Sequence, residues 1–309
     1  MVMLESLHEH SPEAVIHVLC LSEECLTAMR QLAYPYVSLI PLSELEAADP
    51  ELAAVRGTRS LVEYYFTITP CFPWFLLNER NLDEVTYLDA DMMFFASPEP
   101  LFEEAGDASV IITPHRFSPA LAALEKYGKY NVSWMTFRST SSGRACLHWY
   151  REACLDWCCD ELEEMRFADQ KYLDFFSEKF PGVHSMQHAG GGVAPWNIEG
   201  TKFSERGGVF FVNNDPWIFY HAQGFKHIAW RFYASGLLPY AARLNSPALK
   251  KILTVYTRAY GEASKRSNKL IHLFDFHGIR SNKKTSLAPL RNLKRILVEA
   301  FHNSLVLSM

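Results

Sequence analysis

The hydrophobic pattern of the chain alternates between short apolar runs and longer segments in which apolar residues recur every three or four positions. The short runs predict buried strands at residues 14–20, 36–40, 109–113, 130–137, 208–213 and 217–221. The longer segments predict helices at residues 4–10, 22–31 and 141–165. Residues 45–80 are predicted to be largely helical, with interruptions at Pro50, Gly57, Pro70 and Pro73. Strands and helices in this order predict an α/β fold with a mixed, mainly parallel sheet flanked by helices.

Two aspartates interrupt the apolar stretch from Val85 to Phe95. Asp89 and Asp91 are one residue apart, so in an extended segment their side chains project on the same side. Unpaired carboxylates are unfavourable in a buried strand. Mn2+ or Mg2+, in contrast, binds one or two carboxylate oxygens and fills its remaining coordination positions with phosphate oxygens and water. Turns and helix caps also use Asp, which is the simpler alternative. The place of the pair at the end of an apolar strand favours a metal site.

Polar residues in the middle of the chain lie where a ligand could bind. Asn131 is near the start of the strand at 130–137. Asp169 and Gln170 open a new helix after the long helical segment. The simpler interpretation makes Asp169 an N-cap or a first-turn acid, because helix starts favour Asp there.

Two other segments give weaker signals. Three consecutive glycines at 190–192 precede Trp196 and Asn197, and glycine lets a backbone approach a ligand closely. Arg59 lies four residues before Glu63, so on a helix the two side chains share a face. This spacing usually means an exposed ion pair, and a ligand role requires that the face point toward the cleft.

The segment after the last predicted strand combines three useful chemical groups. His221 ends the strand, Gly224 follows three residues later and Lys226 two residues after that. A single histidine at a strand end is usually structural. Here a glycine and a cation close to it could bring backbone amides and a positive charge to the same point as the imidazole.

Charge is distributed unevenly along the chain. Residues 1–239 hold 17 Lys and Arg against 32 Asp and Glu, a net charge of −15. Residues 240–309 hold 13 against 3, a net charge of +10, and the two parts give the total of −5. The second part is predicted to be a basic helical extension. It either docks on the acidic body or is attracted to anionic lipid or a polyanionic substrate.

Targeting signals are not evident. The first ten residues include Glu5 and Glu9 and lack the basic and apolar regions of a secretory signal, and no apolar run approaches the roughly 18 residues of a membrane span. We therefore expect a cytoplasmic protein. The seven cysteines are odd in number, lie mostly in apolar segments and lack zinc-like spacing, which predicts buried free thiols.

Taken together, three motifs resemble the retaining family 8 glycosyltransferases and their bacterial relatives of the cell-surface saccharide type, which have the GT-A fold. The resemblance covers about residues 1–235. The motifs are Tyr87-Leu88-Asp89-Ala90-Asp91, Asp169-Gln170 and His221-x-x-Gly224-x-Lys226.

The resemblance implies roles for these residues. Asp89, Asp91 and His221 would hold Mn2+, or Mg2+, on the diphosphate of a nucleotide sugar, and Gly224 and Lys226 would contact its phosphates. Asp169 and Gln170 would lie beside the transferred sugar as catalytic residues. The remaining candidates for donor binding are Asn131, Trp196, Asn197 and Arg59.

The resemblance also predicts the domain organisation. In that family a first strand, which lines the nucleotide base, precedes the helix that corresponds to residues 4–10. The present sequence starts at this helix, so we expect residues 1–239 to form a nucleotide-sugar-binding GT-A catalytic domain with its first strand missing, and residues 240–309 to form the basic extension.

The expected activity is a metal-dependent, retaining hexosyl transfer to a saccharide or lipid-linked acceptor, with possible contact to an anionic membrane through residues 240–309 and no nucleic-acid partner. One alternative is a catalytically impaired scaffold that only binds. Another is a nucleotidyltransferase, which would normally carry a Gly-rich basic loop that this sequence lacks.

Overall fold

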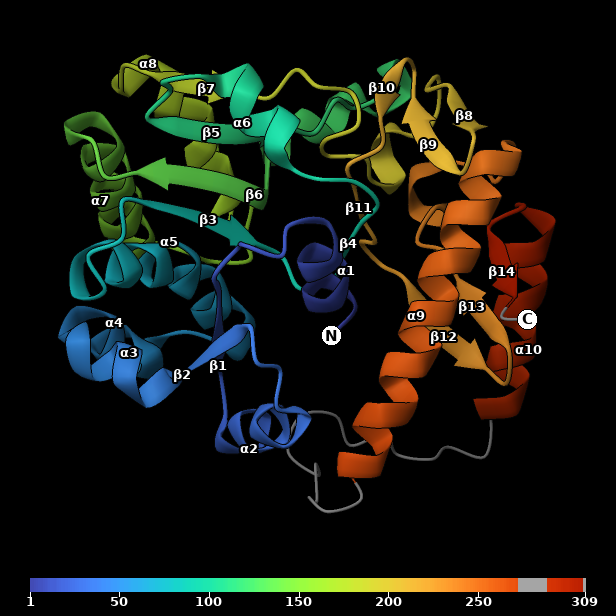
Figure 1. Cartoon of the computed structure of the whole chain (residues 1–309), viewed down its shortest axis with the longest axis horizontal. Coiled ribbons are helices and arrows are strands. Elements are labelled where there is room, and N and C mark those ends of the chain that lie inside the picture. The colour runs from blue at the N-terminus through green and yellow to red at the C-terminus, as the bar shows by residue number, and fades with distance from the viewer. Residues whose placement is uncertain (272–287, 308–309) are drawn as a thin grey trace.

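The computed structural model describes residues 1–271 and 288–307, and it has a mixed α/β fold (Figure 1). The expected α/β class is confirmed. The helices are α1 (Val2–His10), α2 (Glu23–Leu32), α3 (Leu42–Ala48), α4 (Pro50–Val55), α5 (Leu61–Glu79), α6 (Glu99–Ala105), α7 (Ser141–Asp156), α8 (Phe176–Lys179), α9 (Pro247–Ile271) and α10 (Ala288–Phe301). Short 3-10 helices lie at Arg56–Thr58, Pro119–Tyr127, Gln170–Phe175, Pro195–Asn197 and Leu238–Tyr240.

The strands are mostly short. They are β1 (Ile16–Cys20), β2 (Val37–Pro41), β3 (Glu84–Leu88), β4 (Met92–Phe94), β5 (Val110–Pro114), β6 (Tyr130–Arg138), β7 (Val183–Ser185), β8 (Phe203–Arg206), β9 (Val209–Val212), β10 (Asp215–Pro216), β11 (Phe219–His221), β12 (Lys226–Ala229), β13 (Phe232–Ala234) and β14 (Leu305–Leu307). Within the described residues, the β1–β2 and β5–β7 ladders are parallel and the other seven are antiparallel.

The central sheet has the strand order β3-β6-β5-β7. Because β6 runs antiparallel to both β3 and β5, these two strands run in the same direction. The carboxyl ends of β3 and β5 and the start of β6 therefore meet at one edge of the sheet. This topology brings three polar residues to that edge, because each lies next to the strand end in question. They are Asp89 after β3, His115 after β5 and Asn131 near the start of β6.

A second, smaller pairing connects the middle of the chain with its later part. β4 pairs antiparallel with β11, and in this register Met92 lies opposite His221. The amide of Ala222 donates to the carbonyl oxygen of Asp91 at 2.8 Å and continues the pairing by one residue. These backbone contacts fix the end of β11 beside the turn between β3 and β4.

The hydrophobic core consists of two main parts. In the first, α5 and α7 pack against the central sheet through side chains such as Leu76, Leu147 and Met135. In the second, α9 contributes Leu249 and Ile252 to a cluster that also contains residues of β11 and β13. Helix α9 is therefore docked on the body, as one of the two interpretations of the basic segment predicts. The division at residue 239/240 stays a prediction.

Two predicted helices differ from the structure. The helix that starts at Ser141 ends at Asp156 instead of continuing to Met165, and Leu162 and Met165 are exposed. Their helical spacing therefore does not reflect packing against the core. The basic extension is also not helical throughout, because Leu305–Leu307 forms β14 and pairs with β13. The apolar residues from Leu287 to Leu307 also predict a helical stripe, and Leu287 lies outside the described residues.

Local sequence signals explain several boundaries. The hydroxyl of Ser22 accepts from the amide of Cys25 and caps α2, as predicted. Ser60 and Glu63 form a capping box at the start of α5. All seven cysteines are free, and five of them are buried. Among the described residues, no helix has both the length and the apolar composition needed to span a bilayer.

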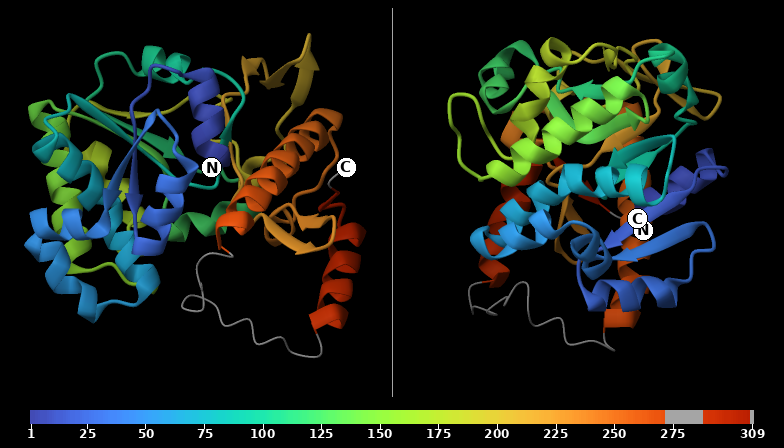
Figure 2. Two further views of the ribbon diagram at one scale, coloured as in Figure 1. Left: turned by 60° about the horizontal axis from the view of Figure 1, so that its bottom comes forward. Right: turned by 90° about the vertical axis from the view of Figure 1, so that its left-hand side faces the viewer.

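Two further views show the arrangement of the C-terminal elements (Figure 2). Helices α9 and α10 lie on the same side of the molecule, with β12 and β13 between them. Helix α10 contacts β12, β13 and β14 and forms an outer edge of the molecule in both figures. This edge lies close to the segment that follows His221.

Candidate functional site

The aspartate pair lies in the turn that joins β3 to β4. The amide of Asp89 donates to the carbonyl oxygen of Ser133 at 3.1 Å and fixes the end of β3 on β6. The hydroxyl of Tyr87 donates to Oδ1 of Asp89 at 3.0 Å. The backbone of Asp91 is held by Ala222, as described above. The positions of both carboxylates are therefore set by sheet pairing and not by the turn alone.

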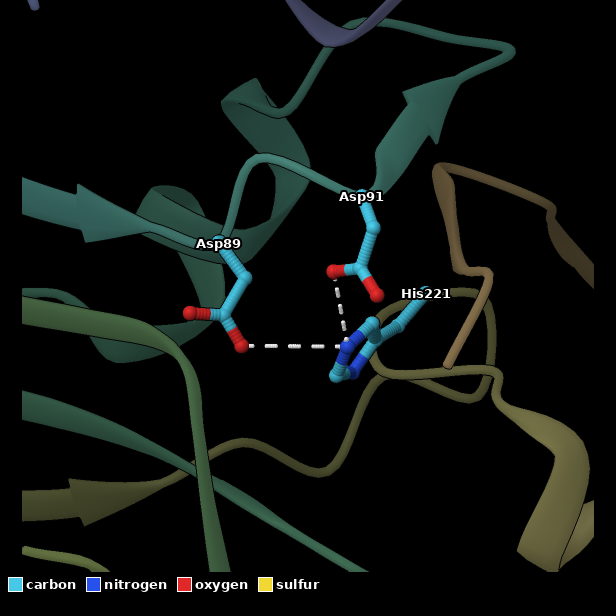
Figure 3. Close-up of side chains that lie close together, drawn as sticks. All are labelled: Asp89, Asp91 and His221. Carbon is cyan, nitrogen blue, oxygen red and sulfur yellow. Dashed lines mark ion pairs between the residues drawn. The ribbon is translucent and has the colours of Figure 1, made fainter. Parts of the chain in front are cut away.

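His221 completes a compact cluster with the two aspartates (Figure 3). Its Nε2 atom lies 3.1 Å from Oδ1 of Asp91 and 3.7 Å from Oδ2 of Asp89. One ligand atom from each of the three residues lies within 4.8 Å of the other two. The imidazole is buried, whereas both aspartates are partly accessible. The cluster is therefore open to a ligand from the carboxylate side.

The three side chains shift one another's pKa values. Burial lowers the pKa of His221, but the neighbouring Asp91 and Asp89 outweigh it and the net shift is upward. Burial raises the pKa of Asp89, and this exceeds the opposing effect of His221. Burial also raises the pKa of Asp91, but interaction with His221 outweighs burial and lowers it overall. A positive charge in the cluster is thus favoured electrostatically.

These residues fit a divalent metal ion. Nδ1 of His221 is buried without a hydrogen-bond partner, and Nε2 points toward the carboxylates of Asp91 and Asp89, where it can bind a proton or a metal ion. Two carboxylates and one imidazole are a donor set that Mn2+ accepts, and Mg2+ is also held by one or two carboxylates with phosphate oxygens and water. Asp89, Asp91 and His221 would hold the ion.

Asp169 is near enough to Asp89 for their charges to interact, and it is almost completely buried. It precedes the 3-10 helix Gln170–Phe175, but its side chain makes no capping hydrogen bond and Oδ2 is unpaired. Burial raises the pKa of Asp169 to about 7; a hydrogen bond with Thr69 opposes this shift and the charge of Asp89 adds to it. The simpler interpretation as an N-cap therefore does not explain the side chain.

Gln170 and Asn131 are held by backbone contacts. Nε2 of Gln170 donates to the carbonyl oxygen of Tyr127 at 3.2 Å. Oδ1 of Asn131 accepts from the amide of Ser133 at 2.9 Å, and its Nδ2 lies 3.4 Å from Nε2 of His115. Asn131 is therefore fixed at the same sheet edge as the carboxylate cluster.

Trp196 lies beside His221, and Asn197 follows it in the same loop. The ring of Trp196 meets the imidazole edge-on at 5.4 Å between centroids, and its indole nitrogen is buried without a partner. Asn197 is buried and uses its amide nitrogen for the carbonyl oxygens of His115 and Gly192. Trp196 packs against the candidate metal ligand, while Asn197 stabilises the surrounding loop.

The glycine-rich loop has a structural reason for its composition. A Cβ atom on Gly190 would lie 1.8 Å from the carbonyl oxygen of Pro216. The carbonyl oxygen of Gly190 accepts from the amides of Ile218 and Phe219. Gly190 is therefore explained by the close packing of this loop on residues 216–219, and not by approach to a ligand.

The segment after His221 forms a different surface. Gly224 adopts a left-handed conformation with φ of 74°, which favours glycine. Lys226 begins β12 and is exposed. Both residues line a cavity of about 440 Å³ together with residues of α10. Lys226 is therefore available to an anion in this cavity.

The structure does not bring Arg59 to the cluster. Arg59 precedes the helix cap Ser60, so it does not share a helical face with Glu63 as the spacing predicted. Its guanidinium donates to the carbonyl oxygens of Cys154 and Leu155 at the end of α7. The side chain satisfies orphan carbonyls of that helix and makes no contact with the other candidate residues.

Comparisons with known proteins place the chain among relatives. No family model matches it. Over 229 residues it is 30% identical to the uncharacterized protein YfnD of Bacillus subtilis (strain 168), a match that covers 73% of each chain. Over 238 residues it is 32% identical to the uncharacterized protein YfnF of the same strain, covering 74% of this chain and 77% of that protein. The chain belongs to the YfnD and YfnF family.

The names of the two YfnD and YfnF relatives assign no activity. Among solved structures, the chain is similar to the apo form of mouse xyloside xylosyltransferase 1, with 13% identity and a TM-score of 0.42. This match covers 72% of the present chain and 90% of the other. The function of this YfnD and YfnF family member is therefore argued from its own residues.

Sequence reasoning missed two residues of the site in this YfnD and YfnF family member. The first is Tyr87, whose hydroxyl donates to Asp89. Side chains two residues apart on a strand point to the same side, so the spacing of Tyr87 and Asp89 could have indicated this contact. His115 is buried against Trp196 and Phe117, and burial lowers its pKa to about 4. Its position directly after a predicted strand, as for Asp89, could have indicated it.

Proposed function

We propose that this protein is a metal-dependent glycosyltransferase that moves a hexose from a nucleotide-diphosphate sugar to a saccharide or lipid-linked acceptor. The observation that carries the proposal is the meeting of Asp89 and Asp91, from the turn between β3 and β4, with His221 at the end of β11, the ligand atoms lying within 4.8 Å of one another. An acidic turn alone would not require a buried histidine whose Nε2 faces both carboxylates. The resemblance to the family 8 glycosyltransferases and the GT-A fold is part of this proposal.

The donor set supports the diphosphate half of the substrate. Mn2+ bound by the cluster would neutralise the negative charge that a nucleoside diphosphate gains as it leaves. The two aspartates remain partly accessible, so phosphate oxygens can approach from their side. Gly224 and Lys226, which follow His221 in the chain, would contact the phosphates of the donor, and Lys226 would add a positive charge there.

The residues on the other side of the cluster support the sugar half. Asp169 and Gln170 would line the sugar, with Asn131 and Trp196 nearby. The unpaired Oδ2 atom of Asp169 and the unpaired indole nitrogen of Trp196 are a hydrogen-bond acceptor and a donor without partners. Such groups are costly when buried and are satisfied by a polar ligand. Retention of configuration, with the acceptor hydroxyl on the leaving-group side, is the stereochemistry we propose.

The acceptor and location are part of the same proposal. A saccharide or a lipid-linked saccharide would be the acceptor, as in cell-surface polysaccharide synthesis. The protein would act on the cytoplasmic side of a membrane, with residues 240–309 in peripheral contact with it. Arg59, given its contacts with α7, has no role in this scheme.

The test is hydrolysis of nucleotide sugars in the absence of acceptor, followed by mass spectrometry of the released nucleotide. We expect Mn2+ to promote slow hydrolysis of one member of a panel of UDP- and GDP-hexoses, and EDTA or Asp91→Asn to reduce it at least 100-fold, an effect within the range of metal-ligand loss. Asp107→Asn, an exposed carboxylate after α6, is the matched control and should keep full activity.

Calorimetry separates this proposal from a scaffold that only binds. The transferase should bind UDP or GDP with an affinity that rises when Mn2+ is present, and Asp91→Asn should abolish that increase. Nucleotide affinity that is indifferent to both the metal and the substitution would contradict the proposal.

A further inference from the structure

Helix α10 has three distinct faces. Glu299 points into the protein, where its carboxylate accepts from the hydroxyl of Ser304 at 2.6 Å. A second face carries Arg291, Lys294 and Arg295. The third face, made of Leu293, Leu297 and Phe301, is apolar and exposed. These faces follow from helical periodicity, because residues four apart share a side.

The apolar face is unusual in its exposure. Leu293 is 53% exposed, Leu297 61% and Phe301 86%. The three residues are spaced four apart and so form one continuous stripe along the outer edge of the molecule. Single exposed apolar residues are ordinary on protein surfaces, whereas a contiguous stripe on an amphipathic helix marks an interaction surface.

The basic face lines the cavity of about 440 Å³ that also contains Lys226. Four cationic side chains thus surround one cavity. One of them, Arg295, is offset by an ion pair with Glu299 at 3.8 Å. Glu299 is the one acidic residue among those that line the cavity, so the lining has an excess of positive charge. Such a lining favours the phosphate of a headgroup over a neutral ligand.

We propose that α10 docks the protein on an anionic lipid bilayer. The stripe of Leu293, Leu297 and Phe301 lies in the boundary between headgroups and acyl chains, and the basic face beside it on α10 contacts the lipid phosphates. A helix with an apolar face beside a Lys- and Arg-rich face is the arrangement that binds at such an interface. The inference rests on the membrane contact of residues 240–309 in the proposed function and specifies which helix makes that contact, but it does not depend on glycosyl transfer.

Charge favours a bilayer over a protein partner. The basic side chains lie next to the apolar stripe on the same helix, and Lys294 lies within one turn of both Leu293 and Leu297. Each Lys or Arg near an anionic surface contributes about 1 kcal/mol of attraction, or about fivefold in partitioning. Shallow insertion of three apolar side chains with several flanking cations matches the two-signal requirement for stable surface binding.

The test is flotation of the full chain with vesicles of phosphatidylcholine and phosphatidylglycerol, without donor or metal. We expect binding that requires phosphatidylglycerol, that weakens about fivefold in Lys294→Gln and that is lost in the double variant Leu297→Gln with Phe301→Gln. Two matched controls should bind normally. Lys250→Gln changes an exposed lysine of α9, and Val15→Gln changes an exposed apolar residue that is distant in sequence from α10.

Three results would overturn the proposal. The first is no binding of the wild type, or equal binding to pure phosphatidylcholine. The second is equal weakening by Lys250→Gln, which would assign the attraction to overall charge. The third is a lipid-free dimer in light scattering that Leu297→Gln dissociates, since a second copy would then cover the stripe. Circular dichroism of each variant confirms that it is folded. Nucleotide-sugar hydrolysis is measured in the same variants. It shows whether the proposed activity fails independently of membrane binding.

Discussion

His221 and Asp91 lie 130 residues apart in the chain, and the imidazole Nε2 is 3.1 Å from the carboxylate Oδ1. The contact arises because β11 pairs with β4 in a register that sets His221 opposite Met92, the neighbour of Asp91. A shift by one residue would turn the imidazole to the other side of the strand. The candidate metal centre is therefore a product of strand register.

Metal affinity is expected to depend on pH. Although burial lowers the pKa of His221, Asp91 and Asp89 raise it above its ordinary value, so protons compete with the metal for the imidazole in the metal-free protein. We predict that Mn2+ binding weakens as the pH falls through the pKa of His221 and levels off above it. Electron paramagnetic resonance of free Mn2+ at pH 6 and pH 8 measures this difference. In His221→Gln the pH dependence should be much smaller; an unchanged dependence would contradict the assignment.

Tyr87 is expected to tune the metal site through Asp89. Its hydroxyl donates to Oδ1 of Asp89 at 3.0 Å, and loss of such a supporting contact typically weakens metal binding 10- to 100-fold. We predict that Tyr87→Phe weakens Mn2+ binding by about tenfold, measured by calorimetry. Tyr150→Phe is the matched control, because the Tyr150 hydroxyl is buried without a partner. Equal effects of the two substitutions would indicate a general change in packing.

The stability of the metal-free protein is expected to change with pH through Asp169. Its pKa is raised to about 7 by burial in the folded state, against about 3.9 in an unfolded chain. Between these values the folded state retains a proton that the unfolded state has lost, so the contribution of Asp169 to stability falls as the pH rises from about 4 to 7 and is constant above.

Asp169→Asn removes this dependence. Relative to the variant, the wild type should lose stability between pH 5 and pH 7.5, by about 2.5 kcal/mol. Urea unfolding in EDTA at the two pH values measures the difference in the free energy of unfolding. A difference between wild type and variant that does not change with pH would show that Asp169 titrates normally.

Gly190 is expected to be intolerant of substitution. A Cβ atom there would lie 1.8 Å from the carbonyl oxygen of Pro216, and backbone atoms cannot give way as a flexible side chain can. We predict that Gly190→Ala destabilises the protein by more than about 2 kcal/mol and displaces β11. Gly57→Ala is the control, because nothing lies within 4 Å of a Cβ atom at that position. Thermal unfolding compares the two, and equal melting temperatures would contradict the packing argument.

Several local features could be predicted from the sequence because short-range physics determines them. Ser22 caps α2 since its hydroxyl reaches an amide three residues away. The apolar runs formed strands near their predicted positions, as for β1 and β2, because buried strands need continuous apolar residues. The carboxylates Asp89 and Asp91 at a strand end indicated a metal site for the same local reason.

Other predictions failed where long-range contacts decide. Arg59 suggested an ion pair or a ligand contact, yet its guanidinium binds carbonyl oxygens at the end of α7, about a hundred residues later. The helix from Ser141 ends at Asp156 although helical spacing continues. The segment Leu305–Leu307 became a strand because β13 offered an open edge. Periodicity carries no information on which partner a segment meets.

The sequence by itself determined the α/β class, most element positions and the carboxylate pair, since these depend on neighbours along the chain. Only the tertiary structure decided that His221 faces Asp91, that Tyr87 holds Asp89 and that Asp169 is buried without a cap. It also decided that α10 exposes one apolar face beside a basic one. These features depend on strand register and on burial, which are set by the packing of the whole chain.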